Sequence, residues 1–215
     1  MSRRRALLTC TLVIAVVAGA LNMPVRTMQA IDHRITAIKI PLYVKVCGFL
    51  YRDYMYKELS GRILNGIDAD SNRVTALYNW TVENIKDQPK GFLVIDDHVW
   101  DIIARRYGKP DQMADVFTTL ASYSGYEAFW YEPDTEETII LSFIKTGDEW
   151  RMFDVYNRRH FAIGEGLGSI TPADPLYEGL LKRINKKIFF RPMRRADKHK
   201  PFSRILYELS RPFLR

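Results

Sequence analysis

Apolar residues recur three and four positions apart in two segments of the chain, which is typical of amphipathic helices. The first segment is 70–85, with Val74, Leu77, Tyr78, Thr81 and Ile85 on one face, and the second is 110–124, with Met113, Val116, Phe117, Leu120 and Ala121. Pro110 suits the first helical position of the second segment, and Gly125 suits its end. We therefore predict two helices that bury one face each, and a shorter helix over 99–106.

After Gly125 the hydrophobic period changes from about three or four residues to two. The alternation predicts strands within 126–132, 138–145 and 150–156, the last two joined by a tight "TGDE" hairpin. Residues 157–175 read as loop, and helices are expected at 176–188 and 202–210. Helices first and an antiparallel sheet afterwards indicate an α+β domain.

The 215 residues are enough for one hydrophobic core. We divide them into an N-terminal segment 1–25, a helical extension 26–69 in which Pro41 begins a helix, a central domain 70–175 and a basic helical tail 176–215. Lys and Arg outnumber Asp and Glu by twelve to two between 182 and 215, so the net charge of +7 belongs mainly to the tail.

The N-terminal segment has the pattern of a targeting sequence. "MSRRR" precedes a run without charges from Ala6 to Val25. Ala18 and Ala20 fit the cleavage site of a signal peptide, while the length of the run also fits a membrane anchor of roughly 20 residues. Both alternatives place the remaining chain on the extracytoplasmic side, anchored, secreted or periplasmic. Cys10 and Cys47 form no disulfide framework, and Cys47 reads as a small apolar residue.

Three pieces of the central segment, in this order, resemble a transglutaminase-like domain of the papain-like cysteine hydrolase superfamily. They are "ALYNWTVENIKD", "DQMADVFTTLASYSGYEAF" and "EWRMFDVY". The second resembles the helix that opens with the nucleophilic cysteine, and the third resembles the strand that ends in Trp-x-x-x-Asp. The resemblance covers about half the chain and implies a Cys–His–Asp triad in which the helix dipole stabilises the thiolate.

This sequence departs from the triad at two of its three positions. The resemblance places the cysteine at Pro110, the histidine near Thr138 and the aspartate at Asp154. No cysteine occurs from Gly48 to Arg215, and no histidine occurs between Trp100 and Asn157. Asp154 alone cannot perform acyl transfer, so the resemblance implies the fold and argues against the reaction.

Other polar residues supply alternative sites. Asp111 at the helix start, with His98 or His160, has the groups for acid–base chemistry in the groove, which Asp97 and Trp150 are also expected to line. Asp111 also reads as a simple helix-terminus charge. The "DDHVWD" stretch offers a local His–Asp pair, but we expect it to be a capping cluster, with no metal and no cofactor.

We therefore predict an exported or membrane-anchored, catalytically degenerate protein that binds a peptide, polymer or protein partner of the cell envelope. The N-terminal segment is expected to contact the membrane. The basic tail 182–215 is read as a solvated face, as a surface for anionic lipid or as one for an anionic partner; nucleic acid is not expected. One alternative is a hydrolase or transferase with a relocated site near Asp111, His98 and Asp154. Another is a structural envelope protein that acts through its tail.

Overall fold

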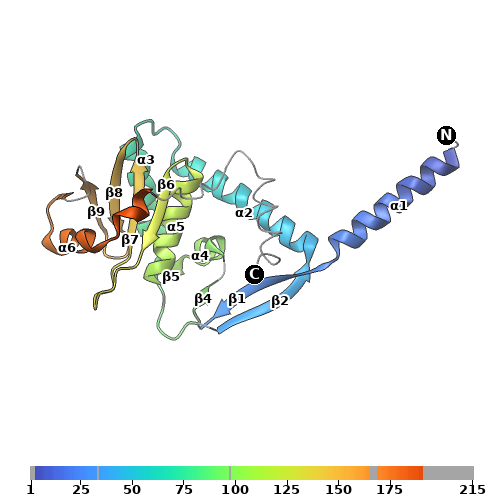
Figure 1. The fold of residues 1–215 in the computed structure, drawn as a ribbon, viewed down its shortest axis with the longest axis horizontal. Helices are drawn as coiled ribbons and strands as arrows, with labels where there is room; N and C mark the ends of the chain where they lie inside the picture. The colour runs from blue at the N-terminus through green and yellow to red at the C-terminus, as the bar shows by residue number, and fades with distance from the viewer. Residues whose placement is uncertain (1–2, 33, 97, 165–168, 191–215) are drawn as a thin grey trace.

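A five-stranded antiparallel sheet forms the centre of the computed structural model, which describes residues 3–32, 34–96, 98–164 and 169–190 (Figure 1). The strand order is β10-β9-β8-β7-β6. The bounds are β6 Glu127–Tyr131, β7 Leu141–Thr146, β8 Glu149–Asp154, β9 Arg159–Ile163 and β10 Ile170–Thr171. Gly147 adopts a positive φ of 61° in the β7–β8 hairpin, which confirms the turn expected from "TGDE".

Each face of the sheet is covered by its own helices. Successive residues of a strand point to opposite faces, so Ile144 and Phe153 pack with α2, α3, α4 and α5, whereas Phe143 and Met152 pack with α6 and the 3₁₀ helix η2. The bounds are α2 Leu42–Ile63, α3 Asp70–Asn84, α4 Val99–Arg105, α5 Pro110–Tyr123, α6 Pro175–Arg183 and η2 Lys186–Phe190. The α+β prediction is confirmed, and so are the helices expected at 70–85, 99–106 and 110–124.

The extension before the domain differs from the helical prediction for 26–69. Residues 24–41 form a hairpin of β1 Pro24–Ile31 and β2 Arg34–Pro41. The Ile- and Thr-rich stretch 34–40 favours a strand, and Asp32 fixes the turn because its carboxylate accepts from the Val94 N–H at 2.8 Å. A short strand, β4 Ile95–Asp96, pairs with β1 on its other side. The predicted helix does follow, as α2.

Strands also replace part of the loop expected at 157–175, where β9 and β10 lie. A short parallel pair, β3 Lys86–Asp87 and β5 Tyr107–Gly108, brings the end of α3 beside the start of α5. The tail helix expected at 202–210 lies outside the described residues.

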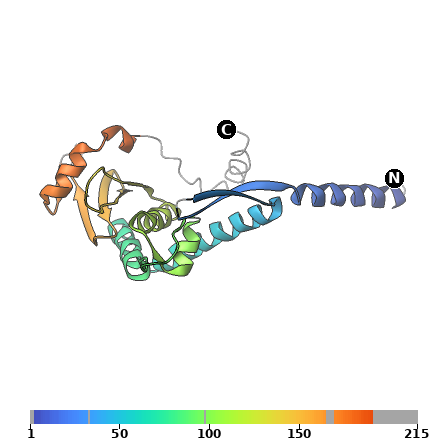
Figure 2. The ribbon, with the colours of Figure 1, turned by 90° about the horizontal axis from the view of Figure 1, so that it is seen from below.

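The membrane-anchor alternative for the N-terminus is wrong. Residues Arg3–Leu21 form helix α1, which projects from the domain beyond the hairpin (Figure 2). No helix in the part of the chain that the structure describes is long and apolar enough to cross a membrane. The 19 residues of α1 begin with three arginines, so its apolar part is shorter than the roughly 20 residues that a span needs. The signal-peptide alternative stays a prediction.

Candidate functional site at the two ends of helix α5

The N-terminal end of α5 is filled by the side chain of Gln112, which is only 4% exposed. The Gln112 amide nitrogen donates to the Ile95 carbonyl at 2.9 Å. Its amide oxygen accepts from the Lys109 backbone N–H at 3.2 Å and from the Arg105 guanidinium at 3.1 Å. Because Gln112 is the third residue of the helix, its bond to Lys109 has the form of a capping box.

Arg105 ties the same end of α5 to the chain on either side of it. Its guanidinium donates to the Ile95 carbonyl and to the Tyr107 carbonyl, both at 3.0 Å. A Cβ atom on Gly108 would lie 3.1 Å from the Gln112 Cβ, so a larger residue there would force Gln112 to shift by a few tenths of an ångström. We call this group, Ile95, Arg105, Gly108, Pro110 and Gln112, the closed end of α5. Its polar groups bind one another.

Asp154, the acid expected from the triad, lies on the other face of the sheet from α5. The neighbouring Phe153 packs against Phe117 of α5 at a ring-centroid distance of 5.0 Å, so Asp154 points toward α6. The fully buried carboxylate accepts from the Asn157 side-chain amide and from the Tyr177 hydroxyl, both at 2.8 Å. Burial raises the pKa of Tyr177, and the hydrogen bond to Asp154 raises it further. These contacts give Asp154 a structural role.

The other residues expected at the triad or in the groove are dispersed. Thr138 is exposed before β7, and its carbonyl accepts from Asn157 at 3.0 Å. Trp150 is buried against Phe129 and Phe189 on the α6 face. Asp111 lies partly buried in the first turn of α5. Asp111 and Trp150 belong to opposite sides of the sheet, because α5 packs on one face and Trp150 on the other.

The two candidate histidines, His98 and His160, also lie apart from Asp154. His98 is the exposed N-cap residue of α4, and Asp97 is outside the described residues. His160 stands opposite Phe153 in β9 and stacks on its ring at 5.9 Å, which places it on the α5 side of the sheet. Burial, together with the nearby charge of Arg151, lowers the pKa of His160. Within the described residues, no group of three or more His, Cys, Asp or Glu side chains could hold a metal ion.

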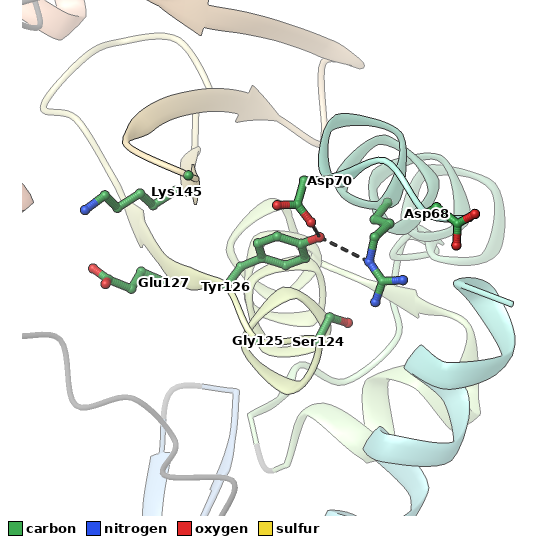
Figure 3. Close-up of a pocket in the computed structure, with 9 residues that line it drawn as sticks. Asp68, Asp70, Ser124, Gly125, Tyr126, Glu127 and Lys145 are labelled. Atoms are coloured by element: carbon green, nitrogen blue, oxygen red, sulfur yellow. Dashed lines mark hydrogen bonds between the residues drawn. The ribbon is translucent and has the colours of Figure 1, made fainter. Parts of the chain in front are cut away.

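The C-terminal end of α5 borders a pocket of about 490 Å³ (Figure 3). Gly125, with a φ of +105°, ends the helix and turns the chain into β6. The lining residues come from the start of α3, the end of α5, β6 and the β7–β8 hairpin: Asp68, Asp70, Arg73, Ser124, Gly125, Tyr126, Glu127, Lys145 and Gly147. We call this group the open end of α5.

A hydrogen-bonded trio organises one wall of the pocket. The Tyr126 hydroxyl donates to Asp70 at 3.0 Å and accepts from Arg73 at 3.3 Å, as Figure 3 shows. Arg73 also donates to the Ile67 carbonyl at 2.9 Å. Burial raises the pKa of Tyr126, because the charged form is poorly solvated there and the Asp70 carboxylate disfavours it further. Tyr126 therefore remains a neutral hydroxyl at physiological pH.

A second, smaller pocket continues from the first. It has a volume of about 270 Å³ and shares Arg73 and Ser124 with the larger one. Its remaining lining comes from α2 and the end of α5: Lys57, Ser60, Gly61, Leu64 and Tyr123. The two hollows therefore adjoin at Arg73 and together border α2, α3 and α5.

Sequence reasoning did not single out the open end. Asp70 was only the first residue of a predicted helix, and the structure shows that its carboxylate accepts from the Tyr126 hydroxyl. These two residues lie 56 positions apart. The available signal was a glycine-terminated helix followed by a tyrosine, which does not identify a pocket.

Comparisons with known proteins add one distant structural likeness. No family model matches the chain, and no curated protein matches it. The solved structure of "a Putative Cysteine Protease from Cytophaga hutchinsonii" matches 52% of this chain with 16% sequence identity and a TM-score of 0.40. The match spans 42% of that protein's chain. A likeness of this extent supports no conclusion about activity.

Proposed function

We propose that this protein is an exported, catalytically degenerate transglutaminase-like domain that binds a peptide segment of a cell-envelope partner. The closed end of α5 supports the non-catalytic part. Pro110 stands where the resemblance calls for the cysteine, and the space beside it is taken by Gln112 and Arg105. Proline also lacks the backbone N–H that a helix start offers to an oxyanion.

The open end carries the binding part of the proposal. Its pocket combines cations, Arg73 and Lys145, with the carboxylates of Asp68, Asp70 and Glu127. A surface with both signs of charge complements a ligand with both signs, and it repels a uniformly anionic polymer at the carboxylates. The adjoining second pocket suits a chain-like ligand. A mixed-charge peptide meets both conditions.

Export is the second part of the proposal. The arginine-rich start, the apolar run and the Ala18-x-Ala20 pattern support a cleaved signal peptide. Helix α1 carries exposed side chains from Leu7 to Leu21, so its removal leaves the core intact. N-terminal sequencing of the protein from its native host tests this part. A new N-terminus near Leu21 supports export, and a protein that retains Met1 throughout contradicts it.

Binding is tested by NMR titration of the full chain with two short peptides, Ala-Glu-Lys-Ala and tetraglutamate. We expect Ala-Glu-Lys-Ala to shift the amide signals of Gly125 and Tyr126, with little effect from tetraglutamate. Lys145→Glu should weaken this binding about tenfold, the effect of losing roughly 1.4 kcal/mol. Lys90→Glu, an exposed lysine outside the pocket, is the matched control. Equal weakening by both variants contradicts a site at the open end.

The two alternatives from the sequence gain no support from the geometry. A relocated active site requires His98 or His160 to meet Asp111 and Asp154, and Asp154 and His160 point to opposite faces of the sheet. The tail that would act in a structural protein falls mostly on residues 191–215, outside the described part of the chain. Its attraction to anionic lipid or polymer stays a prediction.

A further inference from the structure

Helix α2 is apolar on two opposite sides. On the inner side, Tyr56 and Ser60 are buried, and Leu59 and Ile63 pack against the core. The outer side exposes a second set of apolar and aromatic residues, between 41% and 64% accessible: Tyr43, Val44, Leu50, Tyr51 and Tyr54. Charged residues separate the two sides, and exposed apolar residues gathered on one side of a helix are typical of a contact surface, so we expect the outer side of α2 to have a cover.

The spacing on the outer side identifies the kind of cover. Tyr43, Cys47, Leu50 and Tyr54 follow one another at intervals of four, three and four residues. This is the spacing of a helix that packs its side chains between those of another helix. Cys47 is exposed within this set. We call these four residues the outer stripe of α2, and its natural partner is an amphipathic helix.

The chain contains a matching segment beyond the described residues. In "PFSRILYELSRP", Phe202, Ile205, Leu206 and Leu209 recur at helical spacing. Pro201 and Pro212 stand on either side, at positions typical of a helix start and a helix stop. Arg204, Tyr207 and Glu208 fall on the opposite face of such a helix. The pattern predicts one apolar face about two turns long, which can cover about two thirds of the roughly three turns of the outer stripe.

The connection between η2 and this segment is eleven residues long. Residues 191–201 separate the last described residue, Phe190, from Phe202. An extended chain covers about 3.3–3.6 Å per residue, so this linker spans up to roughly 36–40 Å. The linker must follow the surface of the domain, so this span sets the longest path from Phe190 along which the segment can bind in the same molecule.

We propose that residues 202–209 bind the outer stripe of α2 in the same molecule as an amphipathic helix. The contact buries Leu50 and Tyr54 against Leu206 and its neighbours and shields the Cys47 thiol. It also holds α2, which follows directly on the β1–β2 hairpin, to the chain beyond η2. This interaction uses a different surface from the open end of α5 and does not depend on peptide binding there.

Thiol reactivity of Cys47 tests the proposal in the full chain with Cys10→Ser. Leu206→Asp places a charge on the docking face, and we expect the reaction of Cys47 with Ellman's reagent to accelerate about tenfold, equivalent to roughly 1.4 kcal/mol of docking free energy. Tyr207→Asp places the same charge on the opposite face and should leave the rate unchanged. Equal rates in the parent and both variants overturn the proposal.

Cross-linking distinguishes the same molecule from a second copy. In the Cys10→Ser chain, Leu206→Cys should form a disulfide with Cys47 under mild oxidation, within one chain and at a yield independent of protein concentration. Tyr207→Cys should not. Two results overturn the proposal: Cys47–Cys47 dimers, or protection of Cys47 that increases with protein concentration. Either one assigns the outer stripe to a second copy.

Discussion

The two ends of helix α5 differ in how they use their polar groups. At the closed end, Gln112 is buried and bonds to Ile95, Lys109 and Arg105. At the open end, Tyr126 bonds to Asp70 and Arg73 in the wall of a pocket that is open to solvent. One end is a structural junction, and the other places charged side chains around a pocket.

We propose that this difference separates the frame of a transglutaminase-like fold from its chemistry. A catalytic helix start must leave backbone N–H groups and a nucleophile accessible to substrate. Here a proline and a buried glutamine occupy that start, while the accessible polar surface lies at the other end of the same helix. The proposed binding role rests on the open end, and we expect the closed end to contribute stability.

The largest expected effect comes from the middle of α5, on which both ends depend. Phe117 is fully buried and packs against Tyr78 and Phe153. Phe117→Ala should lower the free energy of unfolding by about 3–5 kcal/mol, because it leaves a cavity. Urea denaturation measures the loss. Phe92→Ala, at a ring that is 55% exposed, is the control and should cost less than about 1 kcal/mol. Similar losses in both variants would place the core elsewhere.

Substitutions at the two ends should differ in cost. Gln112→Leu removes the partner of buried donors and acceptors at Arg105 and Ile95, so we expect a loss of about 1–3 kcal/mol in unfolding free energy. Tyr126→Phe removes a hydroxyl whose partners are partly exposed, and it should cost less than about 1 kcal/mol. If urea denaturation shows that Tyr126→Phe lowers the unfolding free energy more than Gln112→Leu does, the assignment of the two ends is contradicted.

The loss of peptide affinity should be larger for variants of the open end than for Gln112→Leu at the closed end. Tyr126→Phe and Lys145→Glu alter the pocket itself, whereas Gln112→Leu leaves the pocket lining intact. Urea denaturation and peptide titration of these same variants therefore distinguish the roles of the two ends.

Alkaline pH should destabilise the protein through Tyr78, which packs between α5 and the sheet. Burial raises the pKa of Tyr78 from 10.0 to about 12, and the charge of Asp154 adds to the effect. The neutral hydroxyl is thus favoured in the folded state, so the stability it confers is complete below pH 10 and is lost as the pH rises toward about 12. Tyr78→Phe should flatten this decline in urea midpoints measured from pH 9 to 11.5. An unchanged slope would assign the decline to other groups.

The predictable parts of the fold are those with a clear hydrophobic period. Helix α5 could be placed within a residue or two, since five apolar residues at helical spacing stand between Pro110 and Gly125. The β1–β2 hairpin was missed because its Ile and Thr residues were read together with the helix that follows Pro41. The end of the hairpin is held by a bond between Asp32 and Val94, which lie 62 positions apart.

The candidate sites depended on contacts that spacing does not reveal. Pro110 could be read as a lost nucleophile, but the burial of Gln112 requires Ile95 and Arg105 beside it. Asp154 matched a motif, yet the alternation of β8 directs it to Tyr177 and away from α5. Tertiary packing decides both cases, and neither follows from the local sequence.

The reactivity of a cysteine installed at the closed end tests the central claim most directly. Pro110→Cys, in a chain with Cys10→Ser and Cys47→Ser, restores the nucleophile at the position that the resemblance assigns to it. The closed end and the adjacent Asp111 predict a thiol without activation, which reacts with iodoacetamide no faster than free N-acetylcysteine and only as the pH approaches the ordinary thiol pKa of about 8.5. Rapid alkylation at pH 6, faster than that of N-acetylcysteine, would show an accessible, activated helix start and would contradict the account.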